Sequence, residues 1–292
     1  MYFNEITSYN NLTYSIDKLR LKTYINYDSW NDLDFYFRTF YGDKISNYWI
    51  SDKISQFKYN YTIEVEERVV IYIGFSHNQE KHDEHHGLYN LTIEFNPNKM
   101  KYRPIIKHII NLSGEWFVRS YDLAIDVKVN ILDIIPDKGL KRKMKIFTNG
   151  YDDITYEIGS GDKRLKIYNK KIESNLNILG NLTRIEITRQ MDDFPVGYAK
   201  LFNYPVEDFP EIYTNDYIVS LFDYKMDKTL LVHVFAVQSG FPLNKVSRTY
   251  KNKIKQLFEG GNKIRFTSKD ATMVFRKTMY SYFINNSKIH WK

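Results

Sequence analysis

One short stretch alternates like a half-buried strand: Arg164-Leu165-Lys166-Ile167-Tyr168-Asn169-Lys170-Lys171. Alternation with a period of two predicts a β-strand that buries one face and leaves the other in water. Leu165 and Ile167 fall on the apolar face, whereas Lys166, Tyr168 and Lys170 fall on the polar face. The stretch therefore predicts a sheet with one face in the core and a tyrosine between two lysines on the other.

The tyrosine between the two lysines is the candidate reactive group. Cations near a phenol lower the cost of forming the phenolate, and they also attract phosphate. This combination indicates a nucleophile acting on a nucleic-acid backbone, with Tyr168 catalytic and Lys166 and Lys170 assisting it. The alternative interpretation is structural, because the chain has 25 tyrosines and most tyrosines pack with only the hydroxyl in water.

Three further strand-like stretches carry acidic residues opposite their apolar residues. They are 92–95, 122–127 and 184–187, and the acids are Glu94, Asp122, Asp126 and Glu186. If these strands are neighbours, the carboxylates converge and a hard cation such as Mg²⁺ or Mn²⁺ would bind their oxygens. Such an ion would polarise a phosphodiester.

The spacing of the two aspartates limits this predicted metal site. Four residues of strand separate Asp122 from Asp126 by about 13 Å, so both cannot bind one ion directly unless the strand bends. We therefore favour Glu94 with one of the two aspartates as ligands. The alternative is an ordinary antiparallel sheet with one face in water, whose sequence pattern would be the same.

The positive charge is concentrated near the end of the chain. The formal net charge is +7, yet eleven Lys or Arg and two acids follow position 247, so the first 247 residues have a net charge of about −2. A basic, aromatic-rich segment predicts phosphate binding, and the alternative is a solvated basic helix. The candidate DNA-binding residues are Arg248, Lys251, Lys253, Lys255, Lys263, Arg265 and Lys269.

The order of patterns predicts an α+β fold with a central antiparallel sheet and a helical, basic C-terminal part. A hairpin is expected over 61–75, and strands are expected over 89–95, 118–129, 145–147, 155–158, 163–169 and 182–188. Helices are expected over 102–112, 217–222, 230–237, 246–258 and 271–283. We divide the chain into a catalytic domain, 1–205, whose first 60 residues have an ambiguous pattern, and a region for DNA recognition and dimerisation, 206–292.

Composition excludes several classes of protein. The chain has no cysteine, which rules out disulfides, thiolate zinc sites and a cysteine nucleophile, and fits a reducing compartment. No signal peptide or membrane span is apparent, so we expect a cytoplasmic protein. The histidine cluster His82–His86 lies in a predicted loop and matches no regular metal-ligand spacing, and His233 lies in an apolar run typical of a core.

The same strands carry a resemblance to a known family. Ile93-Glu94-Phe95-Asn96-Pro97-Asn98-Lys99, Asp122-Leu123-Ala124-Ile125-Asp126 and Leu165-Lys166-Ile167-Tyr168-Asn169-Lys170-Lys171 occur in this order and spacing. The chain here resembles the replication initiators of staphylococcal-type rolling-circle plasmids. The segments 184–187 and 248–255 extend the similarity, which covers about residues 90–255.

The resemblance implies a nicking and closing enzyme that requires Mg²⁺ or Mn²⁺, on a fold related to that of the histidine-type nickases but with acidic metal ligands. It places the nucleophile on Tyr168 and the metal site on Glu94 and Asp122, with Asp126 and Glu186 less central. It also implies origin recognition by a segment near Lys251–Lys269, a homodimer, and origin DNA as partner in duplex and single-stranded hairpin form. A host helicase would act with it.

The sequence departs from the family pattern in one motif and leaves three functions open. The family has an arginine two residues before the first aspartate of the 122–126 motif, where this chain has Ser120 and a displaced Arg119. The first is that of a replication initiator, which forms a 5′-phosphotyrosyl link to DNA and later rejoins the strand. The second is that of a relaxase, which mobilises a conjugative element. The third is that of a non-catalytic DNA-binding regulator.

Overall fold

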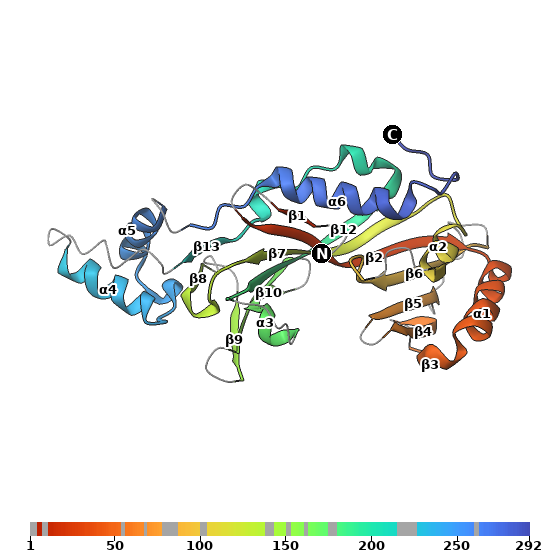
Figure 1. Cartoon of the computed structure of the whole chain (residues 1–292), viewed down its shortest axis with the longest axis horizontal. Helices are drawn as coiled ribbons and strands as arrows, with labels where there is room; N and C mark the ends of the chain where they lie inside the picture. Colours follow the sequence, from red (N-terminus) through yellow and green to blue (C-terminus); the bar gives the residue numbers. More distant parts are fainter. Residues whose placement is uncertain are drawn as a thin grey trace.

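The computed structural model describes residues 5–7, 11–53, 56–66, 69–77, 87–99, 104–137, 143–149, 153–160, 163–174, 180–214, 227–259 and 263–292. Antiparallel strands form a large twisted sheet in these residues, and helices lie along one of its faces (Figure 1). The fold is thus a mixed α and β arrangement built on an antiparallel sheet, as the sequence predicted. No helix in the described ranges has the length and apolar character needed to cross a bilayer.

Strands distant in the sequence are neighbours in the main sheet, whose order is β3-β4-β5-β6-β2-β7-β12-β11-β10-β9, with β1 paired to β2. The first half of the chain contributes β1 (Ile6–Thr7), β2 (Thr13–Ile25), β3 (Ile45–Ile50), β4 (Phe57–Glu66), β5 (Val69–His77), β6 (Tyr89–Phe95) and β7 (Phe117–Val127). The second half contributes β9 (Met144–Thr148), β10 (Ile154–Ser160), β11 (Lys163–Asn169) and β12 (Thr183–Pro195).

Helices cover the apolar face of this sheet. The helix α6 (Ser268–Phe283) runs along it and contacts β2, and α2 (Pro104–Ile110) packs beside α6 (Figure 1). The helix α1 (Tyr27–Tyr41) buries Trp30, Leu33 and Phe37. The Trp30 ring stacks on Phe75 of β5 with centroids 4.5 Å apart. The short helix α3 (Lys170–Glu173) follows β11 directly.

A second, smaller hydrophobic core lies at one end of the molecule (Figure 1). The strands β8 (Ile134–Asp137) and β13 (Glu211–Thr214) form a separate two-stranded ribbon. The helices α4 (Lys228–Gln238) and α5 (Arg248–Glu259) pack on it. Its buried residues are Ile135, Tyr213, Leu230, Val234, Val237, Leu243, Val246, Ile254 and Phe258.

The predicted elements from residue 61 onward are largely confirmed within the described residues. The hairpin forms as β4 and β5, β6 and β11 have the predicted bounds, and Pro104 begins α2. The pattern before residue 60 was ambiguous and concealed β2, which lies at the centre of the sheet. The predicted helix 217–222 and the cluster His82–His86 lie outside the described residues.

The packing does not divide the chain at residue 205. Residues of α6, including Val274, Phe275 and Phe283, belong to the large core under the main sheet, whereas α4 and α5 belong to the small one. The helical C-terminal part is therefore divided between two hydrophobic cores, because its last helix, α6, packs on the main sheet. Among the described residues, α4 and α5 together with the ribbon form a packing unit of their own.

The last residues of the chain are fixed against the loop between α2 and β7. The side chain of Asn286 donates from Nδ2 to the carbonyls of Ile110 and Ser113, at 2.8 and 3.1 Å. A Cβ added at Gly114 would lie 2.6 Å from the carbonyl oxygen of Lys288. Glycine is therefore needed at this position because two backbone segments approach closely.

We expect Gly114→Ala to lower the free energy of unfolding by about 1–3 kcal/mol, because the added methyl group forces the C-terminal segment away. Gly42→Ala is the matched control, since a Cβ there meets no atom within 4 Å. Urea denaturation of the two variants measures the difference. Equal stability of both variants would show that the segment does not pack as described.

Candidate functional site

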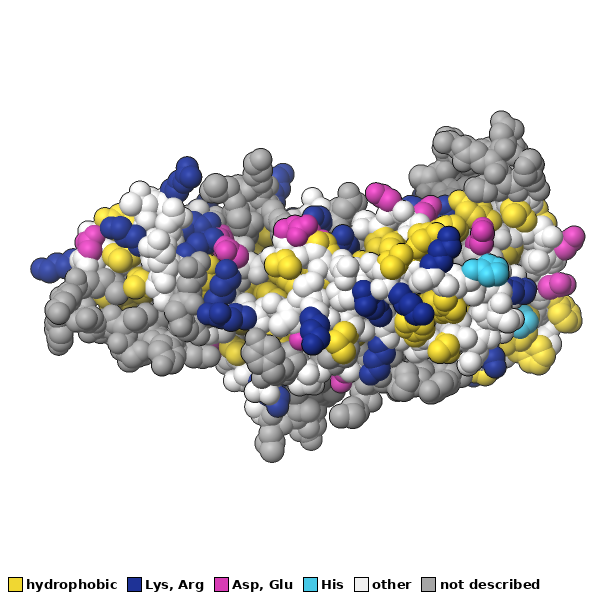
Figure 2. All heavy atoms as spheres, turned by 90° about the horizontal axis from the view of Figure 1, so that it is seen from above, with side chains coloured by type: hydrophobic (Ala, Val, Ile, Leu, Met, Phe, Trp, Pro, Cys, Tyr) yellow, Lys and Arg dark blue, Asp and Glu magenta, His cyan; other side chains and the backbone are white. Residues whose placement is uncertain are grey.

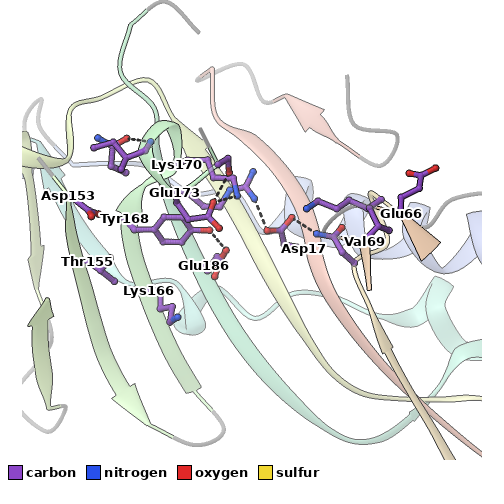
Figure 3. A pocket seen from close by; sticks show the side chains of 16 residues that line it. Asp17, Glu66, Val69, Asp153, Thr155, Lys166, Tyr168, Lys170, Glu173 and Glu186 are labelled. Atoms are coloured by element: carbon purple, nitrogen blue, oxygen red, sulfur yellow. Dashed lines mark hydrogen bonds and ion pairs between the residues drawn. The ribbon is translucent and has the colours of Figure 1, made fainter. Parts of the chain in front are cut away.

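Tyr168 donates a hydrogen bond from its hydroxyl to Oε1 of Glu186 on the neighbouring strand. Figure 3 shows the ring and this carboxylate pointing toward one another. Burial and then the charge of Glu186 raise the pKa of Tyr168 well above its usual value, and burial raises the pKa of Glu186. In the protein without DNA, Tyr168 is therefore a neutral phenol whose proton already points at a carboxylate.

Arg184 lies opposite Tyr168 in the strand register, and its ion pairs join the strands that form the floor of the site beneath Tyr168 and Glu186. It donates to both oxygens of Asp126 on β7, from Nε at 2.6 Å and from Nη2 at 2.7 Å, and its Nη1 donates to Asp17 of β2 at 2.7 Å. Its side chain is only 3% exposed. A buried guanidinium needs such partners, because an unpaired charge in the interior is strongly unfavourable.

A groove of about 1090 Å³ opens over this floor. Tyr168, Arg184 and Glu186 line it on one side, and Figure 3 shows Glu66 and Val69, from the β4–β5 hairpin, on the other. Asp17 lies between the two sides. The groove thus crosses several strands of the polar face, with the tyrosine near one end.

The two lysines predicted to flank the tyrosine both line the groove. Lys166 lies 3.5 Å from Glu157 of β10, a loose ion pair in which the lysine side chain is 34% exposed. Lys170 begins α3 instead of continuing the strand, and it is buried, with its Nζ 2.7 Å from Glu173 and 5.7 Å from the centre of the Tyr168 ring. Lys170 therefore brings positive charge close to the phenol, whereas the ammonium group of Lys166 is paired with Glu157.

The strand register places all four predicted acidic residues on the same face of the sheet as Tyr168. They do not converge on one point. Glu94 lies on β6, four strands from β11, which is about 19 Å at the usual strand spacing. It forms ion pairs with Lys18 at 2.6 Å and Arg20 at 2.5 Å. Asp126 is held by Arg184.

The missing family arginine has a counterpart on the adjacent strand. Ser120, where the family pattern has arginine, lies opposite Arg20 of β2 in the register. A guanidinium therefore occupies this part of the polar face, but it comes from β2 and binds Glu94. The displaced Arg119 instead donates to Asp193 at 2.8 Å.

Unlike Glu94 and Asp126, the other two acids, Asp122 and Glu186, form no ion pair with a basic side chain among the described residues. In the register Asp122 faces Thr188, and Glu186 lies one diagonal step away on β12, a separation that side chains of this length can bridge. Mg²⁺ is commonly held by one or two carboxylates together with substrate phosphates. No group of three or more His, Cys, Asp or Glu suited to a metal occurs in the described part of the chain.

The basic C-terminal residues fall into two groups with different surroundings. Lys251 and Lys255 reach the two oxygens of Asp137 on β8, at 2.7 and 2.6 Å, and Lys263 lies 3.2 Å from Glu211 on β13. These three lysines hold α5 and the following segment to the ribbon. They are therefore part of the packing of the small unit and do not form an open cationic surface.

The exposed face of α5 carries the other group. Arg248, Thr249, Asn252, Lys253 and Gln256 are all exposed on this helix. Lys253 lies 5.5 Å from the ring of Tyr250, and Lys269 and Arg265 are exposed beyond the helix. Figure 2, which looks onto the α6 side, shows Lys and Arg side chains along the whole of this face, including the end where α4 and α5 lie.

The most important residue that the sequence did not reveal is Asp17. It occupies an extra position in β2, where the register with β7 shifts between Ile16 and Lys18. The alternation of apolar residues from Leu19 to Ile25 is regular, and it could have indicated a strand. The extra residue puts Tyr14 and Ile16 out of phase with this alternation, so the pattern from Tyr14 to Ile25 does not read as one strand.

The chain has little detectable similarity to known proteins. No protein-family model matches it, and no curated protein sequence does. Among solved structures it is similar to the rolling circle replication initiator protein from Geobacillus stearothermophilus. The identity is 12%, the match covers 88% of this chain and 99% of that chain, and the TM-score is 0.37. No residue role is transferred from this likeness.

The ion pair of Asp17 predicts a pH-dependent stability. Burial alone would raise the pKa of Asp17, but Arg184 and Lys170 outweigh burial and hold that pKa below its usual value. A carboxyl group with a lowered pKa stabilises the fold above the unfolded pKa of about 3.9 and loses this effect as the pH falls through the folded pKa.

We therefore expect Asp17→Asn to lower the free energy of unfolding by about 2 kcal/mol at pH 7, since hydrogen bonds to charged groups contribute about 1.5–3 kcal/mol. The difference from the unmodified chain should shrink below about pH 4. Urea titrations at pH 7, 5 and 3.5 measure it, with the exposed Asp192→Asn as control. A constant difference at all three pH values would contradict the ion pair.

Proposed function

We propose that the protein is a replication initiator that nicks one strand of a specific DNA origin and later rejoins it. The observation that carries this proposal is the hydrogen bond from Tyr168 to the partly buried carboxylate of Glu186 at the edge of a polar groove. A tyrosine whose proton has an acceptor in place is equipped to become a nucleophile. The groove beside it, crossing the open face of the sheet, is a suitable path for single-stranded DNA.

The proposed chemistry at Tyr168 uses these contacts. The phenol gives its proton to Glu186, and the phenolate oxygen forms a bond to the phosphorus of the scissile phosphodiester. The bond from phosphorus to the 3′-oxygen breaks, and that oxygen takes a proton from water to become the 3′-hydroxyl that primes synthesis. The product is a 5′-phosphotyrosyl link, and attack by a 3′-hydroxyl reverses the reaction and rejoins the strand.

A divalent cation is part of this proposal because the groove is rich in negative charge. It is lined by five carboxylates, those of Asp17, Glu66, Asp153, Glu173 and Glu186, and by four cationic groups, those of Lys99, Lys166, Lys170 and Arg184. A phosphate entering such a groove needs additional positive charge. Mg²⁺ or Mn²⁺ held by Asp122 and by Oε2 of Glu186, the oxygen that does not accept from Tyr168, would supply it and would polarise the phosphodiester.

Recognition of the duplex origin is assigned to the small unit of α4, α5 and the β8–β13 ribbon. On α5, Arg248, Asn252 and Gln256 are spaced four residues apart, so they follow one face of the helix. All three are exposed, and these residue types form hydrogen bonds to base edges in the major groove. Lys253 beside them would contact the backbone. We assign DNA contacts to this face instead of to Lys251, Lys255 and Lys263, because the ammonium groups of these three lysines bind carboxylates.

Two other functions remain as rivals. A relaxase for DNA mobilisation would use the same tyrosine chemistry and would differ only in the DNA site it recognises. A non-catalytic regulator would use α5 alone and would need no nucleophile. The Tyr168–Glu186 pair favours an enzyme over a regulator, because binding duplex DNA gives no reason to hold a partly buried phenol against a carboxylate.

The first test of the proposal is the nucleophile. We expect the chain to form a detergent-stable covalent adduct with supercoiled DNA of its own replicon in the presence of Mn²⁺, and we expect Tyr168→Phe to form none. Tyr156→Phe is the matched control, since Tyr156 lies on the neighbouring strand opposite Ile167 and so belongs to the apolar side. Gel electrophoresis of labelled DNA in detergent measures the adduct.

An adduct of Tyr168→Phe at the normal level would exclude Tyr168 as the nucleophile. Loss of the adduct in both variants would point to a structural effect and not to the missing hydroxyl. Binding of the replicon DNA without any adduct, in the unmodified chain, would favour the regulator.

The two groups of C-terminal lysines should respond differently to substitution. We expect Lys253→Ala to weaken duplex binding and to reduce the slope of log K against log salt by about 0.9, the value for one phosphate contact, without loss of stability. We expect Lys251→Ala to lower the free energy of unfolding by about 3 kcal/mol, because it breaks a buried ion pair. Fluorescence anisotropy and urea denaturation make the two measurements. If Lys251→Ala reduced the salt slope and Lys253→Ala reduced the stability, Lys251 and not Lys253 would be the DNA-binding lysine.

A further inference from the structure

The turn after β6 has a conspicuous sequence, Asn96-Pro97-Asn98-Lys99, and most of it has a clear structural task. The backbone N–H of Asn98 donates to Oδ1 of Asn96 at 2.9 Å, and the Asn98 side chain donates to the carbonyl of Ile16 at 3.1 Å. The hydroxyl of Tyr282 on α6 donates to the carbonyl of Pro97 at 2.5 Å. The turn is thus tied to β2 on one side and to the long covering helix on the other.

Asn96 also ties the turn to the floor of the groove. Its Nδ2 donates to Oδ1 of Asp17 at 3.2 Å, and the other oxygen of Asp17 accepts from Arg184. The turn is therefore connected through Asp17 and Arg184 to the strand beside Tyr168. Both Asn96 and Lys99 line the groove.

The side chain of Lys99, unlike those of Asn96 and Asn98, does not hold the turn to a neighbouring element. Its side chain is exposed, and it forms no ion pair or hydrogen bond with any residue in the described ranges. The other cations of the groove differ from it. Arg184 is bonded to two aspartates, Lys170 to Glu173, and Lys166 more loosely to Glu157. Lys99 is an ammonium group on a rigid turn, and it faces a groove that carries excess negative charge.

We propose that Lys99 holds a backbone phosphate of single-stranded DNA, several nucleotides from the one that Tyr168 attacks. This inference rests on the proposed function and names the path of its substrate. The turn follows β6, four strand spacings from β11, which is about 19 Å. Stacked nucleotides advance about 3.4 Å each. Lys99 and Tyr168 therefore contact different phosphates of one strand, and the groove between them is the track of the flanking nucleotides.

Binding of a non-specific single strand tests this role without any chemical step. The probe is a fluorescein-labelled oligothymidine of twelve nucleotides, with anisotropy measured from 25 to 200 mM NaCl on the full chain. For Lys99→Gln we expect the slope of log K against log salt to fall by about 0.7, the value for one phosphate of a single strand, which is about fivefold in affinity at 0.1 M salt. Lys107→Gln on α2, an exposed lysine on the helical side of the sheet, is the matched control.

Each outcome decides the question. A lower slope in Lys99→Gln together with an unchanged slope in Lys107→Gln supports the proposal. An unchanged slope in Lys99→Gln, equal losses in both variants, or no binding of the oligothymidine by the unmodified chain overturns it. The covalent adduct of Tyr168 is measured separately on replicon DNA, so a failure of the proposed track is distinguished from a failure of the proposed nicking activity.

Discussion

The ion pairs of Arg184 are the interaction on which the rest of the site depends. One guanidinium joins β12 to Asp126 of β7 and to Asp17 of β2, and Asn96 connects the turn after β6 to the same carboxylate. Tyr168 lies opposite Arg184 in the register, and Glu186 is the next residue of β12 on that face. A buried charge with fixed partners leaves little freedom to the strands that carry them. Tyr168, the proposed nucleophile, and Glu186, its proposed proton acceptor, therefore lie on a strongly constrained part of the polar face.

The sequence predicted this face well because a strand has a simple geometry. Alternation with a period of two fixes which side chains share a face, and it placed Tyr168, Glu186, Asp122, Asp126 and Glu94 together. It could not fix distances across the sheet, because strand order depends on contacts between distant segments. Glu94 and Asp126 thus appeared as candidate metal ligands, although each has basic partners of its own. Their role as ligands remains a prediction.

The central strand β2 shows where the pattern fails. Its extra residue, Asp17, interrupts the alternation, so the pattern does not show the whole strand, and that same residue binds Arg184. A bulge of this kind commonly redirects a side chain near a functional site. The C-terminal charge illustrates a second limit. Counting charges located a basic segment, but counting does not show which lysines are used within the fold. Asp137 and Glu211, far away in the sequence, determine that for Lys251, Lys255 and Lys263.

The central claim is that the phenolic oxygen of Tyr168 forms the covalent bond to DNA. Mass spectrometry of the DNA-linked peptide tests this most directly. The chain is allowed to react with supercoiled replicon DNA and Mn²⁺, and the product is digested with nuclease and then with trypsin. The account predicts that the peptide Ile167–Lys170 carries a nucleotide through its 5′-phosphate on Tyr168. A nucleotide found on any other tyrosine, or nicked DNA with no modified peptide, would contradict it.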